Sequence, residues 1–200
     1  MPELAVLVLA AGAGRRFGTI KQLALVGGEP LICRAIALAE AVAPGAVHVV
    51  LGAHRMQIAA RLPPGLPVIA CTDWAEGLGT SLTTGMVGLH GQPDGVLVLL
   101  ADQIALRAEA LQALAARWRA APTYAFCAFY GGQPGVPAIF PRRLFAELAS
   151  LRGERGAKPM LRRECGANAQ QAMPEAAIDI DTVDDLARWH AGAPTAGTGP

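Results

Sequence analysis

The chain has 200 residues, of which 52% are hydrophobic and 16% are charged, and its formal net charge at pH 7 is +1. This balance excludes a broad basic face, and with it a nucleic-acid polymer as partner. No apolar run reaches the roughly 18 residues of a membrane span. No basic leader precedes the first apolar run, so we expect a cytoplasmic protein with one domain over residues 1–190 and a disordered tail over 191–200.

The first predicted element is a strand from Leu4 to Leu9, an unbroken apolar run that is typical of a strand buried on both faces of a parallel sheet. The five residues that follow, 10–14, carry almost no side chain, so their backbone is able to approach a ligand closely. Three cations come next, Arg15, Arg16 and Lys21. A plain tight turn explains the glycines but does not require the cations. The spacing fits neither the P-loop nor the dinucleotide fingerprint, and we interpret the stretch as a triphosphate-binding loop.

Strands then alternate with helices along the chain. The patterns predict helices over 30–42, 53–61, 79–89 and 108–121, and strands over 46–51, 66–71 and 95–101. This alternation predicts an α/β fold, a three-layer Rossmann-like sheet that is mostly parallel, with right-handed crossovers. Ligands of such sheets bind at the carboxyl ends of the strands, where the opening loop also lies.

The second half of the chain predicts a small antiparallel insertion and a final strand. Strands over 124–130 and 136–140 flank a glycine-rich hairpin, helices follow over 141–151 and 158–165, and the last strand is expected over 177–181. Thr182 and Asp185 form a capping box at the start of the final helix.

A polar stretch precedes the predicted helix over 79–89. Gly79, Thr80 and Ser81 are expected to present free N–H groups and hydroxyls at the helix N-terminus, able to bond a base edge or an anion. An ordinary N-cap is the simpler interpretation. Trp74, shortly before them, either stacks on a ligand or closes the core.

Asp102 directly follows a buried strand at the same sheet edge as the cationic loop, which suits a carboxylate that carries Mg²⁺. The alternative is a helix cap, but five residues separate Asp102 from the helix that begins near Arg107. Asp179 and Asp181 fall on one side of the predicted last strand, so one of them is a candidate second metal ligand.

Two motifs carry a resemblance to a known family. They are Leu9-Ala10-Ala11-Gly12-x-Gly14-x-Arg16-Phe17-Gly18-x-x-Lys21 and Gly28-x-Pro30-Leu31-Ile32. They resemble the MobA-like NTP transferases, and among these the molybdenum cofactor cytidylyltransferases, over 4–189. The resemblance implies that the loop and the stretch after Trp74 bind the nucleotide, and that Mg²⁺ assists three catalytic residues. The implied catalytic residues are Arg16, Lys21 and Asp102; the implied nucleotide-binding residues are Ala10, Ala11, Gly12, Gly14, Arg15, Arg16, Lys21, Gly79, Thr80 and Ser81.

The resemblance also implies an acceptor side. It comprises Gly135, Val136 and Pro137, together with Lys158 for the acceptor phosphate, although exposed charges that flank a helix explain Lys158 equally well. Many members of the family have His where this chain has Val136. This departure concerns the acceptor and leaves the nucleotide loop untouched.

One position in the loop indicates which nucleotide is the donor. The Leu-Ala-Ala-Gly form around Ala11 is common in the cytidylyltransferases, whereas Leu-Ala-Gly-Gly is common in the guanylyltransferases, so the resemblance implies CTP as donor. It further implies molybdopterin as the phosphorylated acceptor, pyrophosphate as leaving group, and a molybdoenzyme as delivery partner. The alternatives are a transferase for a sugar or polyol phosphate, and a nucleotide-binding chaperone without catalysis.

Overall fold

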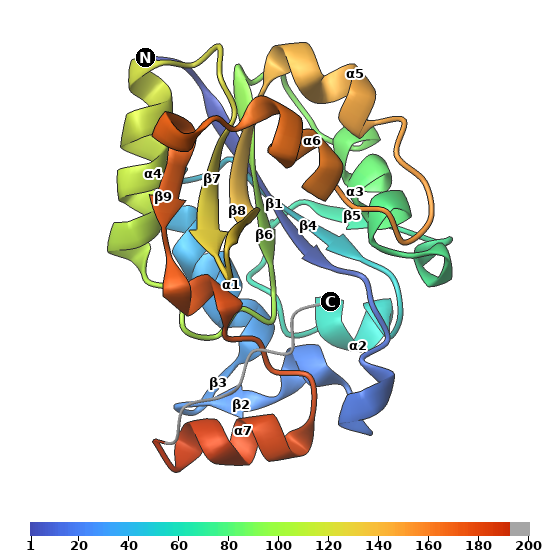
Figure 1. The fold of residues 1–200 in the computed structure, drawn as a ribbon. Coiled ribbons are helices and arrows are strands. Elements are labelled where there is room, and N and C mark those ends of the chain that lie inside the picture. Colours follow the sequence, from blue (N-terminus) through green and yellow to red (C-terminus); the bar gives the residue numbers. More distant parts are fainter. Residues whose placement is uncertain (193–200) are drawn as a thin grey trace.

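Seven strands form one sheet in the order β5-β4-β1-β6-β8-β7-β9 (Figure 1). The structure is a computed structural model that describes residues 1–192; the tail expected over 191–200 lies, from residue 193 onward, outside the described residues. Strand β8 runs antiparallel to both of its neighbours, and the other pairs are parallel. The strands are β1 (Leu4–Ala10), β4 (Val47–Leu51), β5 (Val68–Ala70), β6 (Gly95–Leu100), β7 (Phe126–Tyr130), β8 (Gln133–Pro141) and β9 (Gln170–Ala172).

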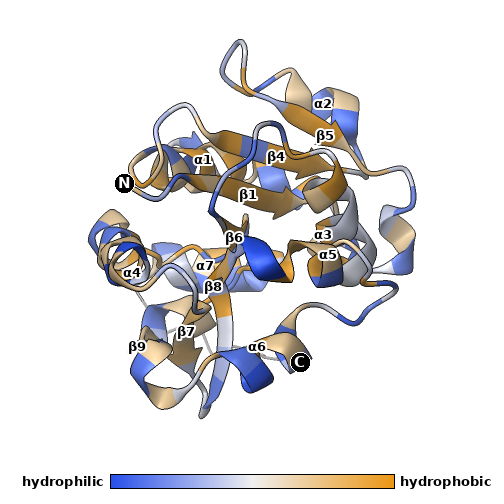
Figure 2. Ribbon diagram, turned by 90° about the horizontal axis from the view of Figure 1, so that it is seen from above, coloured by the Kyte–Doolittle hydropathy of each residue, from blue (hydrophilic) through white to orange (hydrophobic). Residues whose placement is uncertain are grey.

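Helices cover both faces of this sheet, so the predicted three-layer α/β architecture is confirmed. Val6 and Val8 of β1 belong to one core cluster with α1 (Leu31–Glu40) and α4 (Ala108–Ala120). Leu7 and Leu9 point to the other face, into a cluster with α3 (Leu78–Val87), α5 (Phe145–Leu148) and α6 (Lys158–Glu164). Seen from above, the apolar strands lie between these two groups of helices (Figure 2). All residues of β1 are buried, which is why its sequence shows a continuous apolar run instead of alternation.

Smaller elements complete the described chain. Strands β2 (Leu25–Val26) and β3 (Glu29–Pro30) form a separate antiparallel pair, and α2 (Arg55–Ala59) follows β4. Two glycines with positive φ, Gly131 and Gly132, make the tight turn between β7 and β8. Among the helices of residues 1–192, none is both long and apolar enough to cross a membrane.

The prediction of a strand over 177–181 is wrong. A 3-10 helix, η6 (Pro174–Ala177), precedes this segment, and the residues from Ile178 to Asp181 have no regular structure. The position beside β7 is occupied by β9, which the sequence analysis missed because Gln170–Ala172 lacks an apolar pattern. The period-two argument that placed Asp179 and Asp181 on one side of a strand therefore does not hold.

The helix expected over 141–151 is also shorter than predicted. Pro141 still belongs to β8, where it pairs with Gly95, so the helical part begins only after it. It consists of the 3-10 turn η4 (Arg142–Leu144) and the single turn α5.

The last helix of the described chain packs against the segment that follows the glycine-rich loop. Helix α7 (Val183–His190) packs beside β2 and β3 (Figure 1), and its Leu186 and Trp189 contact a small core that includes Phe17, Val26 and Ile180. The predicted capping box of Thr182 and Asp185 is present at its N-terminus. This packing brings the segment before α7 next to the glycine-rich loop.

Candidate nucleotide-binding site

A cavity of about 540 Å³ opens at the carboxyl ends of β1 and β6. It brings together nine of the residues that the sequence analysis assigned to nucleotide, catalysis or metal. These are Ala10, Ala11, Gly12, Gly14, Arg15, Arg16, Lys21, Ser81 and Asp102. Its other walls are formed mainly by residues between Trp74 and Leu78 and by Glu154. The sequence analysis singled out Trp74 but did not assign Glu154 to the site.

The backbone of the loop is shaped by a glycine and a glutamine. Gly14 has φ +58°, and a Cβ there would lie 2.9 Å from Cβ of Lys21, so a side chain is excluded. The buried Gln22 donates from Nε2 to the carbonyl oxygens of Ala10 at 3.0 Å and Gly12 at 2.7 Å. These carbonyls are therefore satisfied within the protein. No local sequence signal marks Gln22, because the bonds depend on how the loop folds back.

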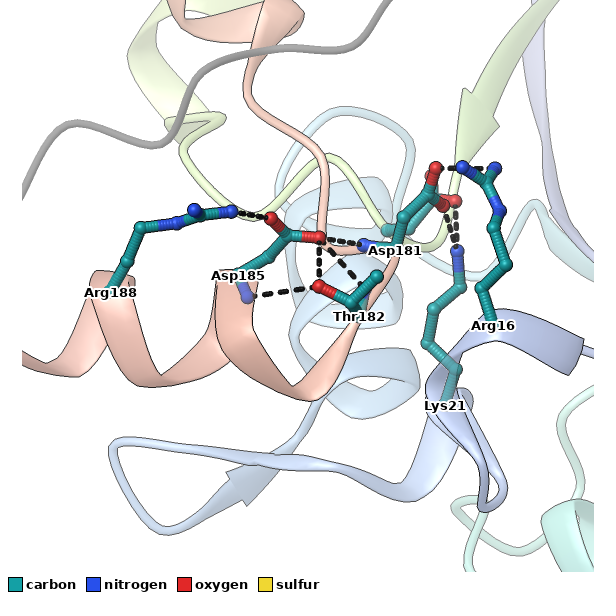
Figure 3. A network of polar contacts seen from close by, with 7 residues as sticks. Arg16, Lys21, Asp181, Thr182, Asp185 and Arg188 are labelled. Atoms are coloured by element: carbon teal, nitrogen blue, oxygen red, sulfur yellow. Dashed lines mark hydrogen bonds and ion pairs between the residues drawn. The ribbon is translucent and has the colours of Figure 1, made fainter.

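An ion-pair network joins the loop to the far end of the chain. Lys21 Nζ lies 2.8 Å from Asp102 Oδ2 and 3.0 Å from Asp181 Oδ1, and an Arg16 nitrogen lies 2.7 Å from Asp181 Oδ2. Figure 3 shows Arg16 and Lys21 pointing from the loop toward Asp181. Burial by itself lowers the pKa of Lys21, but the charges and hydrogen bonds of the two aspartates outweigh it and raise this pKa above 10.5. Lys21 is therefore charged at neutral pH.

Of the two carboxylate oxygens of Asp102, Oδ2 takes part in this network and Oδ1 does not. Its Oδ1 is buried and has no hydrogen-bond partner among the described residues. A buried carboxylate oxygen without a partner costs free energy, and such an oxygen is the kind of ligand that Mg²⁺ prefers. Asp102 thus fits a magnesium ligand.

The other two aspartates differ from one another. Asp181 pairs with both cations, whereas Asp179 makes no ion pair among the described residues. Burial, together with the charges of Asp102 and Asp181, raises the pKa of Asp179 from 3.8 to about 6. Within residues 1–192, no three His, Cys, Asp or Glu side chains form a group that would hold a metal ion. Which of the two serves as a second metal ligand stays a prediction.

The raised pKa of Asp179 predicts how the stability of the ligand-free protein depends on pH. Between pH 3.8 and about 6 the folded state keeps a proton that the unfolded chain releases, so stability falls as the pH rises through this window. We expect Asp179→Asn to unfold at higher urea concentration than the wild type at pH 7.5. The gain, reduced because solvent still reaches this carboxylate, is about 1 kcal/mol.

At pH 4 the two proteins are expected to unfold alike, and Asp73→Asn, which neutralises an exposed carboxylate, should leave stability unchanged at both pH values. A variant that is less stable than the wild type at pH 7.5 would contradict this assignment.

The capping box fixes the backbone at Asp181. Asp185 Oδ2 accepts hydrogen bonds from the N–H groups of Asp181 at 3.1 Å and Thr182 at 2.8 Å, and Asp185 also pairs with Arg188 (Figure 3). Burial by itself raises the pKa of Asp185, but these hydrogen bonds prevail and lower it to about 2. The first turn of α7 therefore holds Asp181 where the two cations meet it.

The stretch at the start of α3 differs from the prediction. The N–H of Gly79 is not free, because it donates to the carbonyl of Gly153 at 2.8 Å. The Thr80 hydroxyl donates to Glu76 at 3.0 Å and accepts from the N–H of Gly153 at 3.2 Å. Ser81 lines the cavity, whereas Gly79 and Thr80 do not. Gly153 thus takes the N–H of Gly79 and donates to the Thr80 hydroxyl, two of the groups that we expected to face a ligand. The Ser81 hydroxyl donates to the carbonyl of Gly77 at 3.3 Å.

The close packing around Gly79 predicts that a side chain there strongly lowers the stability of the fold. A Cβ at Gly79 would lie 2.4 Å from the carbonyl oxygen of Arg155 and 2.9 Å from that of Gly153, both of them backbone atoms. We expect Gly79→Ala to destabilise the protein by about 1–3 kcal/mol or more and to lower its melting temperature, because segment 152–156 must move. Gly166→Ala is the control, since nothing lies within 4 Å of a Cβ there. Equal melting temperatures for the two variants would refute this close packing.

Trp74 separates the cavity from a second, more open one of about 370 Å³. It packs so closely over Gly52 that a Cβ there would lie 2.5 Å from Cβ of Trp74. Trp74 therefore forms a wall of the site, and stacking on a ligand stays a prediction.

The predicted acceptor residues lie apart from the cavity. Gly135, Val136 and Pro137 belong to β8, and Lys158 begins α6; none of them lines the cavity. The carbonyl of Val136 accepts hydrogen bonds from the Tyr130 hydroxyl at 3.0 Å and from Gln103 at 2.8 Å. A role of these residues in binding an acceptor stays a prediction.

Comparisons with known proteins agree with this geometry. The family model described as MobA-like NTP transferase domain matches residues 6–171. The chain is 35% identical over 118 residues to the bifunctional protein GlmU of Stenotrophomonas maltophilia (strain R551-3), an alignment that covers 57% of this chain and 26% of that protein. The chain thus spans about a quarter of the length of the curated relatives it matches.

Solved structures share the fold. The crystal structure of Rv0371c from Mycobacterium tuberculosis H37Rv is 26% identical, with a TM-score of 0.80, and covers 94% of this chain and 96% of its own. A manganese complex of Rv0371C is 24% identical, with a TM-score of 0.74 and coverages of 93% and 97%. Molybdopterin-guanine dinucleotide biosynthesis protein A from Archaeoglobus fulgidus is 18% identical, with a TM-score of 0.63 and coverages of 92% and 95%.

Proposed function

The chain belongs to the MobA-like NTP transferase domain family, and on this premise we propose that it transfers CMP from CTP to molybdopterin and releases pyrophosphate. The observation that carries the proposal is the junction of Lys21 and Asp102 at 2.8 Å in the wall of one cavity, beside a loop almost free of side chains. The cation suits the phosphates of a nucleotide, and the carboxylate suits a divalent ion that accompanies them.

In the proposed reaction, an oxygen of the acceptor phosphate forms a bond to the α-phosphorus of CTP. The bond from that phosphorus to the bridging oxygen breaks, and both electrons leave with pyrophosphate. No nucleophilic side chain is required, because positioning and electrostatic stabilisation suffice for such transfers. The chain's own part is to orient the triphosphate along 10–14 and to stabilise the departing pyrophosphate with Arg16 and Lys21.

Asp102 is the residue that would hold Mg²⁺, with Asp179 or Asp181 as a second carboxylate. When bound, Mg²⁺ supplies charge neutralisation at phosphate oxygens. In the ligand-free chain Asp102 and Asp181 are paired with Lys21 and Arg16 instead. A triphosphate competes for these two cations and so leaves the carboxylates free for a metal ion. Lys21, Arg16, Asp102 and Asp181 therefore exchange their ion pairs with one another for contacts with the ligand and the metal ion.

The choice of CTP rests on Ala11. This residue is buried, and it lines the cavity beside Trp74. Its methyl group narrows the space compared with glycine, which favours a pyrimidine over the larger purine. The choice of molybdopterin rests on the sequence resemblance alone.

The test is pyrophosphate release measured with Mg²⁺, each of the four common nucleoside triphosphates, and either molybdopterin or a panel of sugar and polyol phosphates. We expect release only with CTP plus molybdopterin. Release with another pair would keep the chemistry and overturn the substrates. Nucleotide binding without release for any pair would favour a chaperone that binds nucleotide and has no catalytic activity.

A further inference from the structure

Gln103, the residue after Asp102, is a buried side chain with an unusual set of hydrogen bonds. Its Nε2 donates to two backbone carbonyls, Val136 in β8 and Ala176 in η6, both at 2.8 Å. Both protons of the amide are thereby used. Its Oε1 is buried and has no partner among the described residues. Gln103 therefore ties the end of β6 to two segments that are distant in the sequence.

The second of these segments leads directly into the carboxylates of the site. After η6, residues 178–181 have no regular structure that would fix them. The Ile180 N–H donates to the Asp102 carbonyl at 3.2 Å, and the Ile180 side chain is buried in the small core beside α7. At Asp181 the stretch is held by the capping box and by the ion pairs with Lys21 and Arg16. The bond from Gln103 to Ala176 anchors the other end of this short stretch.

The carboxylates that this stretch carries need such an anchor. Lys21 Nζ lies 2.8 Å from Asp102 and 3.0 Å from Asp181, so these two carboxylates lie close together and repel one another. Asp179, two residues before Asp181, makes no ion pair among the described residues that would offset its charge. Like charges move apart unless the backbone holds them. The hydrogen bonds from Gln103 Nε2 to the Ala176 carbonyl and from the Ile180 N–H to the Asp102 carbonyl oppose this repulsion.

We propose that Gln103 is a positioning residue that holds segment 176–181 against Asp102, so that one of its two aspartates, Asp179 or Asp181, faces a divalent cation together with Asp102. This inference rests on the proposed function, because it concerns the metal side of that site. An apolar side chain of the same length would fill the space without leaving a buried oxygen unpaired, whereas the amide alone joins the two carbonyls. Gln103 does not line the cavity, so its role is to position the neighbouring segment and not to contact the nucleotide or the metal ion directly.

The experiment compares Gln103→Leu with a matched control, Gln171→Leu. Gln171 in β9 also has a buried, unpartnered Oε1 and donates from Nε2 to one carbonyl, that of Ala110 at 2.9 Å, but it lies away from the cavity. Mn²⁺ binding is measured by electron paramagnetic resonance in the presence of whichever common nucleoside triphosphate the wild type binds most tightly. Binding of that nucleotide without metal and the melting temperature are measured alongside.

We expect Gln103→Leu to weaken Mn²⁺ binding about tenfold or more, as happens in other metal sites when a residue that orients the ligands is lost. Nucleotide binding without metal should change by less than about twofold. Gln171→Leu should change neither. If Gln103→Leu does not fold, Gln103→Asn replaces it, since its shorter amide cannot reach both carbonyls and should also weaken Mn²⁺ binding.

Two results would overturn the inference. Wild-type Mn²⁺ affinity in a folded Gln103 variant would do so and leave the proposed function standing. A wild-type chain that binds nucleotide but no Mn²⁺, or binds neither, would remove the metal side of the proposed function and the role of Gln103 with it.

Discussion

Replacement of Asp102 by Asn is expected to reduce pyrophosphate release by about 10³-fold or more. Asn keeps the shape of the side chain but removes the charge that pairs with Lys21 and replaces a carboxylate oxygen by an NH₂ group. The charge neutralisation that a metal ion supplies is worth several kcal/mol, and each 1.36 kcal/mol corresponds to a factor of ten in rate. The loss should therefore appear in kcat, measured with saturating nucleotide.

Nucleotide binding without metal is the companion measurement. It is expected to be retained or strengthened in Asp102→Asn, because a negative charge that repels phosphates has been removed. Asp94→Asn is the control, since Asp94 is an exposed carboxylate beside the opposite end of β6, where it pairs with Arg142 at 3.3 Å. Full activity in Asp102→Asn would show that Asp102 carries no metal ion in the reaction.

Replacement of Lys21 by Met is expected to lower both the rate and the stability. Without Lys21, pyrophosphate loses a fixed cation as it departs, which costs about 10²–10³ in kcat by comparison with loss of one preorganised donor. The carboxylates of Asp102 and Asp181 also lose a shared partner. Breaking a buried ion pair from one side costs about 3–5 kcal/mol, and we expect the lower end because Asp102 keeps a quarter of its side chain exposed.

Two further variants separate the effects of Lys21. Lys21→Arg keeps the positive charge, so it should recover most of the stability lost in Lys21→Met. It should not recover the rate, because the planar guanidinium does not reproduce the geometry of an ammonium held between two carboxylates. Arg61→Met, which removes an exposed cation, should change neither quantity. Urea unfolding and steady-state kinetics measure both, and a Lys21→Met protein with wild-type kcat would exclude Lys21 from catalysis.

The main parts of the fold and of the cavity were predicted from local patterns. The apolar run of β1 is buried over its whole length, and the loop after it lines the cavity with Arg15, Arg16 and Lys21, as predicted. Asp102 follows β6 at the same edge, and Thr182 caps α7. These features are encoded by residues close in sequence, because strand burial, backbone freedom at glycine and helix capping each depend on a few neighbouring residues.

Wrong or incomplete predictions arose where distant segments meet. The N–H of Gly79 is taken by Gly153, which is 74 residues away, and the strand expected over 177–181 is excluded by β9 at the sheet edge. No local pattern reports whether a helix N-terminus is covered by another segment or which of two polar stretches takes a sheet edge. Both outcomes depend on competition between segments in the folded chain.

The sequence by itself thus determined the architecture, the small residues and cations of the loop after β1, and the position of Asp102 at the end of β6. Only the tertiary structure decided that Asp181, rather than Asp179, pairs with Lys21 and Arg16. It also decided that Gln22 donates to the carbonyl of Gly12 and Gln103 to that of Ala176. The physical reason is distance along the chain. Lys21 and Asp181 are 160 positions apart, and their contact exists because α7 packs its Leu186 and Trp189 against a core formed near the N-terminus.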